Sequence, residues 1–310
     1  MTRESSNNPL RKSILRTLAY YDIFSYPLTA EEIYCNLGDN HTSVDEVSKE
    51  LEKLASENIV FNKDKFYLLK DETNYITRRE KGNQLAEKKL KTARRVSAFI
   101  AHFPFIRGIL LSGSISKGFM EKDSDIDYFV ITHPNRVWFT RLMLMLFKKT
   151  VLLNSKKMFC VNYFVDAENL EIQEKNIFTA TELVTLVPTF GRDIYEEFYK
   201  YNRWTKQYYP NFPKRDVNVI LDRKNGVIKS LLENLLKNKL GDKIDDFAMR
   251  LFERFNQSKY KNYNKEDFKL AFKASKKESK HHPKFLQKKV LQEFEKKIKS
   301  LEEQLGISLN

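Results

Sequence analysis

The sequence is poor in the residues that build disulfide-rich, collagen-like or disordered chains. It has 2 cysteines, 9 glycines and 8 prolines among 310 residues, whereas 41% of its residues are hydrophobic. Two cysteines cannot form a disulfide framework or a cysteine-based zinc cluster. Low glycine and proline together with this hydrophobic content are typical of an ordered, helix-rich globular protein.

Long hydrophobic runs are also missing. The most apolar stretch, residues 137–153, is interrupted by three basic residues and is too short to span a bilayer. The first eight residues are polar and lack the apolar core of a secretory signal. We therefore expect a cytoplasmic protein with no membrane partner, in which Cys35 and Cys160 are reduced core residues.

The chain has fewer acidic than basic residues. The chain has 55 Lys and Arg against 41 Asp and Glu, a net charge of +14, and residues 214–310 alone hold 24 basic against 14 acidic residues. Such a surface attracts polyanions. It suits a triphosphate, an acidic partner or simple solubility equally well, so charge alone does not choose a function.

The length predicts two or three domains, because 310 residues exceed the usual size of a single core. In residues 1–72, two capping boxes begin at Thr29 and Ser43, and apolar runs at 59–61 and 66–69 flank a polar turn. Three helices followed by a hairpin resemble a winged helix-turn-helix domain.

The charges of that domain argue against DNA recognition. Its expected recognition helix, residues 43–58, carries five acidic residues and only Lys49 and Lys53 as basic ones. Such a helix repels phosphates. We therefore do not expect duplex DNA as a partner, and packing against the rest of the chain or another protein is the favoured role.

The remaining segments follow from periodicity. Residues 73–104 predict a long basic linking helix that stops at Pro104. Residues 105–178 read as strand, turn, short helix, strand, helix, strand, which predicts a small mixed sheet. Residues 179–310 predict a C-terminal helical domain with helical patterns at 179–209, 231–255 and 283–305. The predicted fold class is α+β.

The most informative stretch is residues 109–131. An apolar strand runs into a small-residue turn with Gly113 and Ser114, and about ten residues later Asp125 and Asp127 open a second apolar strand. Because strand side chains alternate, the two aspartates point the same way. Paired carboxylates can share a divalent metal, and the free N–H groups of such a turn can hold phosphate oxygens.

This pattern resembles the minimal nucleotidyltransferases of the DNA polymerase β superfamily. The resemblance implies that Gly113 and Ser114 bind the phosphates of a nucleoside triphosphate such as ATP, with charge added by Lys117. It implies that Asp125 and Asp127 bind Mg²⁺ or Mn²⁺. The expected reaction moves a nucleoside monophosphate to an acceptor hydroxyl and releases pyrophosphate. A small molecule, a protein or an RNA end would all serve as acceptor.

The superfamily usually carries a third carboxylate on the next strand. The expected strand, residues 157–165, has Asn162 at its centre. Asparagine can coordinate a metal but cannot accept a proton as a base does. Asp166 shares the strand parity of Asn162, but it lies about 13 Å further along the strand, so it is the weaker substitute.

Asn162 therefore leaves three hypotheses open. The first is an active nucleotidyltransferase with Asp125, Asp127 and Asn162 at its centre. The second is a nucleotide-binding regulator without turnover, and the third is a winged-helix nucleic-acid binder that keeps the catalytic fold only as a scaffold.

Overall fold

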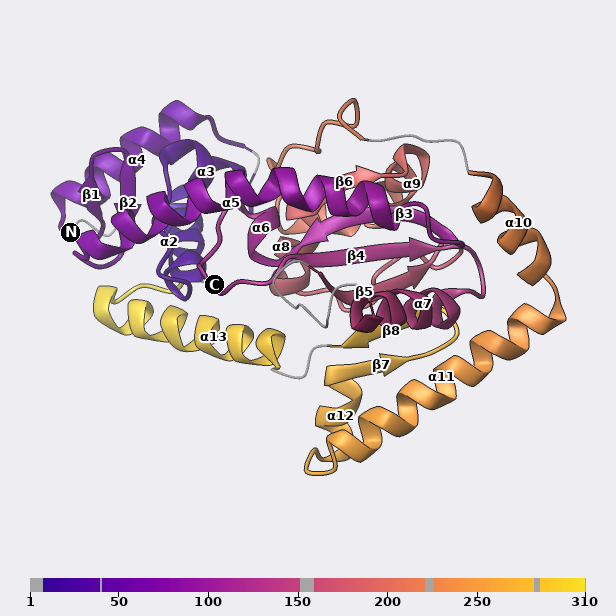
Figure 1. Ribbon diagram of the computed structural model, residues 1–310. Coiled ribbons are helices and arrows are strands. Elements are labelled where there is room, and N and C mark those ends of the chain that lie inside the picture. The colour runs from indigo at the N-terminus through magenta and orange to yellow at the C-terminus, as the bar shows by residue number, and fades with distance from the viewer. Residues whose placement is uncertain (1–7, 40, 151–158, 221–225, 282–284, 310) are drawn as a thin grey trace.

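The computed structural model describes residues 8–39, 41–150, 159–220, 226–281 and 285–309. It has the predicted α+β class, with one mixed six-stranded sheet and a separate two-stranded hairpin. Figure 1 shows a helical unit that contains the N-terminus at one end, the central sheet beside it, and the long helix α5 running across both.

The N-terminal unit forms in the predicted order of three helices and a hairpin. Its elements are α2 (Pro9–Asp22), α3 (Ala30–Cys35), α4 (Val44–Ser56), β1 (Phe61–Lys63) and β2 (Phe66–Leu68). Both predicted capping boxes are present, from Thr29 to Glu32 and from Ser43 to Glu46. In each, the side chains of the first and last residue satisfy free backbone N–H groups at the helix start, which fixes where α3 and α4 begin.

Two acidic residues of the α4 segment form ion pairs within the N-terminal unit. The guanidinium of Arg11 on α2 is fully buried and lies 3.5 Å from the buried carboxylate of Glu50 and 2.5 Å from that of Glu57. A buried cation requires such partners because removing it from water is costly. These two acids of the expected recognition helix therefore hold α2 and α4 together.

Helix α5 (Thr73–Ile100) joins the N-terminal unit to the sheet, as predicted. The buried guanidinium of Arg79 donates to the Pro27 carbonyl and forms an ion pair of 2.6 Å with Glu32. Asn83 donates to the Tyr26 hydroxyl at 3.3 Å. The N-terminal unit thus packs against the rest of the chain, the role that its charges favoured over DNA binding.

The centre of the sheet follows the predicted sequence of elements. It consists of β3 (Ile106–Ser112), α6 (Gly113–Ser116), β4 (Asp127–Thr132), α7 (Val137–Thr150) and β5 (Cys160–Asp166). Strand β4 pairs antiparallel with β3 and parallel with β5. Residues 157 and 158 of the expected third strand lie outside the described part of the chain.

Side chains of β4 alternate between two cores. Tyr128 and Val130 belong to the core covered by α5, α7 and α11 (Lys239–Lys259), whereas Phe129 and Ile131 belong to the core on the opposite face. Asp127 shares the parity of Phe129, so its side chain points toward that second face.

The prediction that residues 179–310 form a helical domain is wrong in its extent. This range supplies three of the six strands, β6 (Val187–Phe190), β7 (Phe272–Ala274) and β8 (Glu278–His281), in the order β6-β3-β4-β5-β8-β7. Pro188 lies within residues 179–209, which were expected to be helical, but β6 is an edge strand, where proline is tolerated. Strand β8 pairs with β5, and Lys280 of β8 and Lys273 of β7 both form ion pairs with Glu174.

The described helices from α8 to α13 do not pack together as one domain. They are α8 (Ile177–Thr185), α9 (Arg192–Tyr201), the 3₁₀ helix η1 (Arg203–Gln207), α10 (Val227–Leu236), α11, α12 (Lys265–Ala271) and α13 (Leu286–Leu305). The helix expected at 231–255 is two helices, because the side chain of Asn238 caps α11. Helix α13 returns to the N-terminal unit, where Val290, Phe294 and Ile298 share its core.

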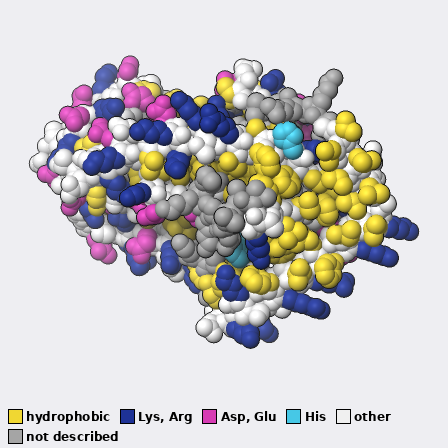
Figure 2. Space-filling model, in the orientation of Figure 1, with side chains coloured by type: hydrophobic (Ala, Val, Ile, Leu, Met, Phe, Trp, Pro, Cys, Tyr) yellow, Lys and Arg dark blue, Asp and Glu magenta, His cyan; other side chains and the backbone are white. Residues whose placement is uncertain are grey.

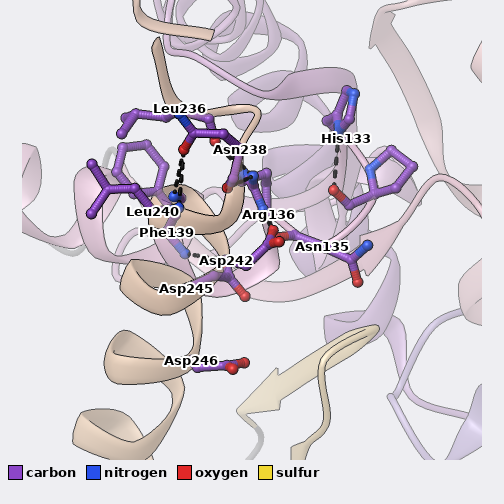
Figure 3. A network of polar contacts seen from close by, with 12 residues as sticks. His133, Asn135, Arg136, Phe139, Leu236, Asn238, Leu240, Asp242, Asp245 and Asp246 are labelled. Carbon is purple, nitrogen blue, oxygen red and sulfur yellow. Dashed lines mark hydrogen bonds and ion pairs between the residues drawn. The ribbon is translucent and has the colours of Figure 1, made fainter. Parts of the chain in front are cut away.

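A polar network fastens α11 to the turn after β4 (Figure 3). The guanidinium of Arg136 donates to the Leu236 carbonyl at 2.6 Å and to Asp242 Oδ1 at 2.6 Å. Asp245 Oδ1 accepts from the backbone N–H groups of Trp138 and Phe139, at 3.0 and 2.7 Å. Asp245 thus satisfies free donors at the start of α7, which positions α7 against the sheet.

Candidate functional site

The glycine bend after β3 lies directly against the Asp127 carboxylate. Ser112, the last residue of β3, is paired with Asp127 across the sheet. Gly113 follows with a φ of +67°, and a Cβ built there would lie 2.5 Å from Asp127 Oδ2. Only glycine accommodates both this backbone conformation and this approach. The turn and the acid motif are therefore one structural unit.

Asp125 lies within electrostatic reach of Asp127. The intervening Ile126 is fully buried, and strand β4 begins at Asp127, so Asp125 sits in the loop that leads into it. Burial raises the pKa of Asp127 to about 7, and the negative charge of Asp125 is the next largest cause. Two acids that share a partly buried position disfavour ionisation of one of them.

Asn162 is hydrogen-bonded to the same carboxylate through a β-bulge. Tyr128 pairs with Val161 and Phe129 pairs with Tyr163, so Asn162 is an extra residue on β5. Its Nδ2 donates to Asp127 Oδ1 at 2.7 Å. Bulges re-aim side chains, and this one directs an amide donor at the acid.

Cys160 completes this group. Its thiol donates to Asn162 Oδ1 at 3.2 Å, which leaves the amide nitrogen of Asn162 facing Asp127. Burial and the neighbouring Asp127 raise the pKa of Cys160 to about 11, so the sulfur keeps its proton at neutral pH. Cys160 therefore acts as a donor that orients Asn162.

Lys117 is held beside the glycine bend by an acid from a distant helix. Its Nζ donates to Glu182 Oε1 at 2.8 Å and to the Gly113 carbonyl at 3.2 Å. Glu182 belongs to α8, on the face toward which Asp127 points, and its charge helps to raise the pKa of Asp127 while Lys117 lowers it. Lys117 is thus a fixed positive charge near the acid pair.

The loop after α6 is anchored to α5 and to the N-terminal unit. Asn83 donates to the Gly118 carbonyl at 2.5 Å, and the Met120 N–H donates to the Gly82 carbonyl at 3.1 Å. The rings of Phe119 and Tyr26 pack edge to face, with their centroids 5.7 Å apart. The N-terminal unit therefore supports the loop that carries Lys117.

Asp166 does not belong to this site. In the pairing of β4 with β5, Cys160 is opposite Asp127 whereas Asp166 is opposite Thr132 at the other end. Asp166 is buried, and its oxygens accept from the backbone N–H groups of Asn135 and Glu168, at 2.7 and 2.8 Å. Asp166 therefore lies past the site, as its distance along the strand indicated, and it stabilises a turn.

The structure brings most of the predicted residues to one end of the sheet. They are Gly113, Ser114, Lys117, Asp125, Asp127 and Asn162. Ser114 lies in the short α6, where its carbonyl accepts from the N–H groups of Lys117 and Phe119, each at 3.1 Å.

Cys160 and Glu182 were not predicted. The pairing of Cys160 with Asp127 requires knowledge of the strand register, and Glu182 lies 65 residues after Lys117 in the chain. Within the described ranges there is no group of three or more His, Cys, Asp or Glu side chains suited to a metal ion. The acids at the candidate site are therefore a pair, with an amide in the third place.

Comparison of the chain with family models, with curated proteins and with solved structures finds no match. The resemblance to nucleotidyltransferases therefore depends on the residues and geometry described above. None of the described helices has the length and apolarity that a membrane crossing requires.

Proposed function

We propose that the chain is a divalent-metal-dependent nucleotidyltransferase that moves a nucleoside monophosphate from a nucleoside triphosphate to an acceptor hydroxyl. The observation that carries this proposal is the contact of the Asp127 carboxylate with the backbone of Gly113. A metal held at Asp127 would adjoin a phosphate held at the turn. Transfer of this kind needs cations beside the phosphates, which neutralise the charge of the leaving pyrophosphate.

The donor set fits Mg²⁺ or Mn²⁺. Both ions prefer oxygen ligands, and Mg²⁺ is commonly held by one or two carboxylates, with water and substrate phosphates completing its shell. Asp125 and Asp127 supply two carboxylates, and burial followed by the negative charge of Asp125 raises the pKa of Asp127. A divalent cation held by this pair would stabilise the ionised form of Asp127, so the pair suits a cation without a third acid.

The other residues have separate roles in this proposal. The bend at Gly113 and Ser114 would hold the phosphates through backbone N–H groups, with Lys117 adding positive charge beside it. Asn162 would fix the orientation of the Asp127 carboxylate through the bond to Oδ1, which leaves Oδ2 on the side of the turn. The acceptor is a small molecule, a protein side chain or an RNA end.

A second candidate is a nucleotide-binding regulator that has lost turnover. Asn162 favours it, because an amide cannot remove the proton of an acceptor hydroxyl. Both candidates share triphosphate binding and differ only in whether pyrophosphate is released.

Calorimetric titration with each nucleoside triphosphate, with and without Mg²⁺, tests the shared part. We expect metal-dependent binding that Asp125→Asn weakens at least about 10-fold, because one metal ligand is lost. Asp123→Asn removes an exposed acid from the same loop and serves as the matched control. Equal binding by wild type and Asp125→Asn would refute the site.

Release of pyrophosphate in the presence of small-molecule, protein and RNA acceptors then separates the two candidates. Release that Asp125→Asn abolishes supports the transferase. Tight metal-dependent binding without release in any acceptor class supports the regulator.

A further inference from the structure

Helix α10 is packed with its charged residues inward. Lys229 and Glu233 are 4% and 2% exposed, although they are ionisable. The opposite side of the helix presents large apolar side chains to solvent, and all of them are more than half exposed: Val227, Ile228, Leu231 and Leu235. A soluble helix normally buries its apolar face. The apolar face of α10 therefore lacks a partner in the described chain.

Polar anchors fix this orientation. The Lys229 ammonium donates to the carbonyl of Ala101 at the end of α5 and to that of Ile106 at the start of β3, at 3.0 and 2.9 Å. The Glu233 carboxylate accepts two hydrogen bonds of 2.9 Å from Arg107 and one of 2.7 Å from the Phe105 N–H. Rotation of α10 would leave these buried charges unpaired, which is strongly unfavourable. The outward apolar face is thus built into the fold.

Helix α11, which follows α10 in the chain, carries an exposed apolar stripe of its own. One side of α11 is buried against α7 through Ala248 and Phe252, which lie in the main core. A second apolar stripe remains exposed and consists of Leu240, Phe247, Leu251 and Phe255. We call these four residues, with the four of α10, the α10–α11 surface. Figure 2 shows hydrophobic side chains spread over this face of the molecule, with Lys and Arg side chains along its outer edge.

Basic side chains border the stripe at a regular spacing. Leu240, Phe247 and Leu251 are each followed three residues later by a basic residue, namely Lys243, Arg250 and Arg254. Three residues advance about 300° around a helix, so this basic row lies directly beside the apolar stripe. All three basic side chains are exposed and have no ion-pair partner within the part of the chain that is described.

Three of the four acidic residues of α11 have partners outside this helix, and the fourth is the half-buried Glu253. Asp242 binds Arg136, Asp245 caps α7, and Asp246 forms an ion pair of 3.0 Å with Lys276. The outer side of α11 therefore presents an apolar stripe beside a row of positive charge, and three of the four acids of this helix are already paired elsewhere.

We propose that the α10–α11 surface docks on an anionic lipid bilayer and holds the protein peripherally at its surface. An exposed apolar stripe bordered by Lys and Arg is the pattern of helices that lie in the membrane interface. Each such basic residue gains from anionic headgroups. A second copy of the chain fits less well, because a two-fold contact would bring two basic rows together. This inference is independent of the proposed nucleotide chemistry, and it departs from the expectation from the sequence that the chain has no membrane partner.

Co-sedimentation with vesicles tests the proposal. Wild-type protein is expected to bind vesicles that contain phosphatidylglycerol and to bind pure phosphatidylcholine vesicles at least about 10-fold more weakly. Lys243→Glu, Arg250→Glu and Arg254→Glu together should reduce binding to anionic vesicles about 100-fold or more. Phe247→Ser with Leu251→Ser should also abolish it, because the apolar anchor is removed. All five positions are exposed, so the fold should tolerate these changes.

The matched control reverses three exposed lysines on α13, which packs on the N-terminal unit (Figure 1): Lys289→Glu, Lys296→Glu and Lys299→Glu. It should keep nearly all of the vesicle binding. Equal losses in both triple variants would overturn the proposal, because they would indicate non-specific attraction by net charge. Absence of binding to anionic vesicles would also overturn it. A wild-type dimer that Phe247→Ser with Leu251→Ser makes monomeric, without vesicle binding, would assign the surface to a second copy.

Discussion

Asp127 lies at the start of β4 and Asp245 lies on α11 beside the start of α7, and both have raised pKa values because they are buried. Their partners differ. Asp245 accepts two backbone N–H groups at the start of α7, whereas Asp127 meets the amide of Asn162, a second acid and the bare backbone of Gly113. Backbone donors cannot be exchanged for a ligand, but side chains can turn away. A raised pKa alone therefore does not identify a functional acid. The type of partner distinguishes the two acids, because only Asp127 has partners that a ligand can replace.

The largest expected effect concerns Asp245. Asp245→Ala should lower the free energy of unfolding by about 2 to 4 kcal/mol, because it leaves two buried N–H groups without an acceptor. Urea denaturation measures this change. Asp127→Ala should cost much less, and an equal loss in both variants would remove the distinction between a structural and a functional acid.

A substitution at the glycine bend should act on both stability and binding. Gly113→Ala places a methyl group against Asp127 Oδ2 at a positive φ, so we expect a loss of about 2 kcal/mol and at least about 10-fold weaker triphosphate binding. Gly306→Ala is the matched control, since Gly306 also has a positive φ but no neighbour within 4 Å of the added carbon. It should cost about 1 kcal/mol and leave binding unchanged. Intact binding in Gly113→Ala would contradict the proposed phosphate position.

The raised pKa of Asp127 predicts a pH-dependent stability. Between about pH 4 and pH 7 the folded protein keeps a proton on Asp127 that the unfolded chain has released, so the free energy of unfolding falls as pH rises. Without divalent metal, Asp127→Asn should therefore be more stable than wild type at pH 8, by about 1 to 3 kcal/mol, and similar to it at pH 4. Denaturation at both pH values measures the difference. A variant that is less stable at pH 8 would mean that the carboxylate is structural.

The smallest expected change in stability concerns Lys117. Its ion pair with Glu182 is partly exposed, so Lys117→Gln should change the free energy of unfolding by at most about 1 kcal/mol. Triphosphate affinity should nevertheless fall several-fold, because a fixed positive charge beside the turn is lost. Lys63→Gln also breaks a partly exposed ion pair, with Asp71, and should leave affinity unchanged. Equal affinities of the two variants would exclude Lys117 from the site.

Local signals predicted a large part of the fold. The capping boxes at Thr29 and Ser43 and the continuous apolar run of β4 gave correct elements, because short-range hydrogen bonds and burial determine them. The strands β6, β7 and β8 were not predicted. They are short, they contain proline or lysine, and they exist because a distant edge of the sheet accepts them.

In the candidate site, too, local patterns were predicted and contacts between distant segments were not. Gly113, Asp125 and Asp127 stand close in sequence, so their spacing carried the prediction. The sequence predicted the strand of Asn162 correctly, but the hydrogen bond from Asn162 to Asp127 depends on a β-bulge that no sequence pattern indicates. Glu182 reaches Lys117 only through the packing of α8, which no local pattern determines.

The most direct test of the central claim is a titration of Mn²⁺ at pH 8, followed by electron paramagnetic resonance, in the presence of a nucleoside triphosphate. We expect wild-type protein to bind Mn²⁺ together with the triphosphate, and Asp127→Asn to bind it at least about 100-fold more weakly, whereas Asp166→Asn, if folded, should match wild type. Undiminished Mn²⁺ binding by Asp127→Asn would contradict the account.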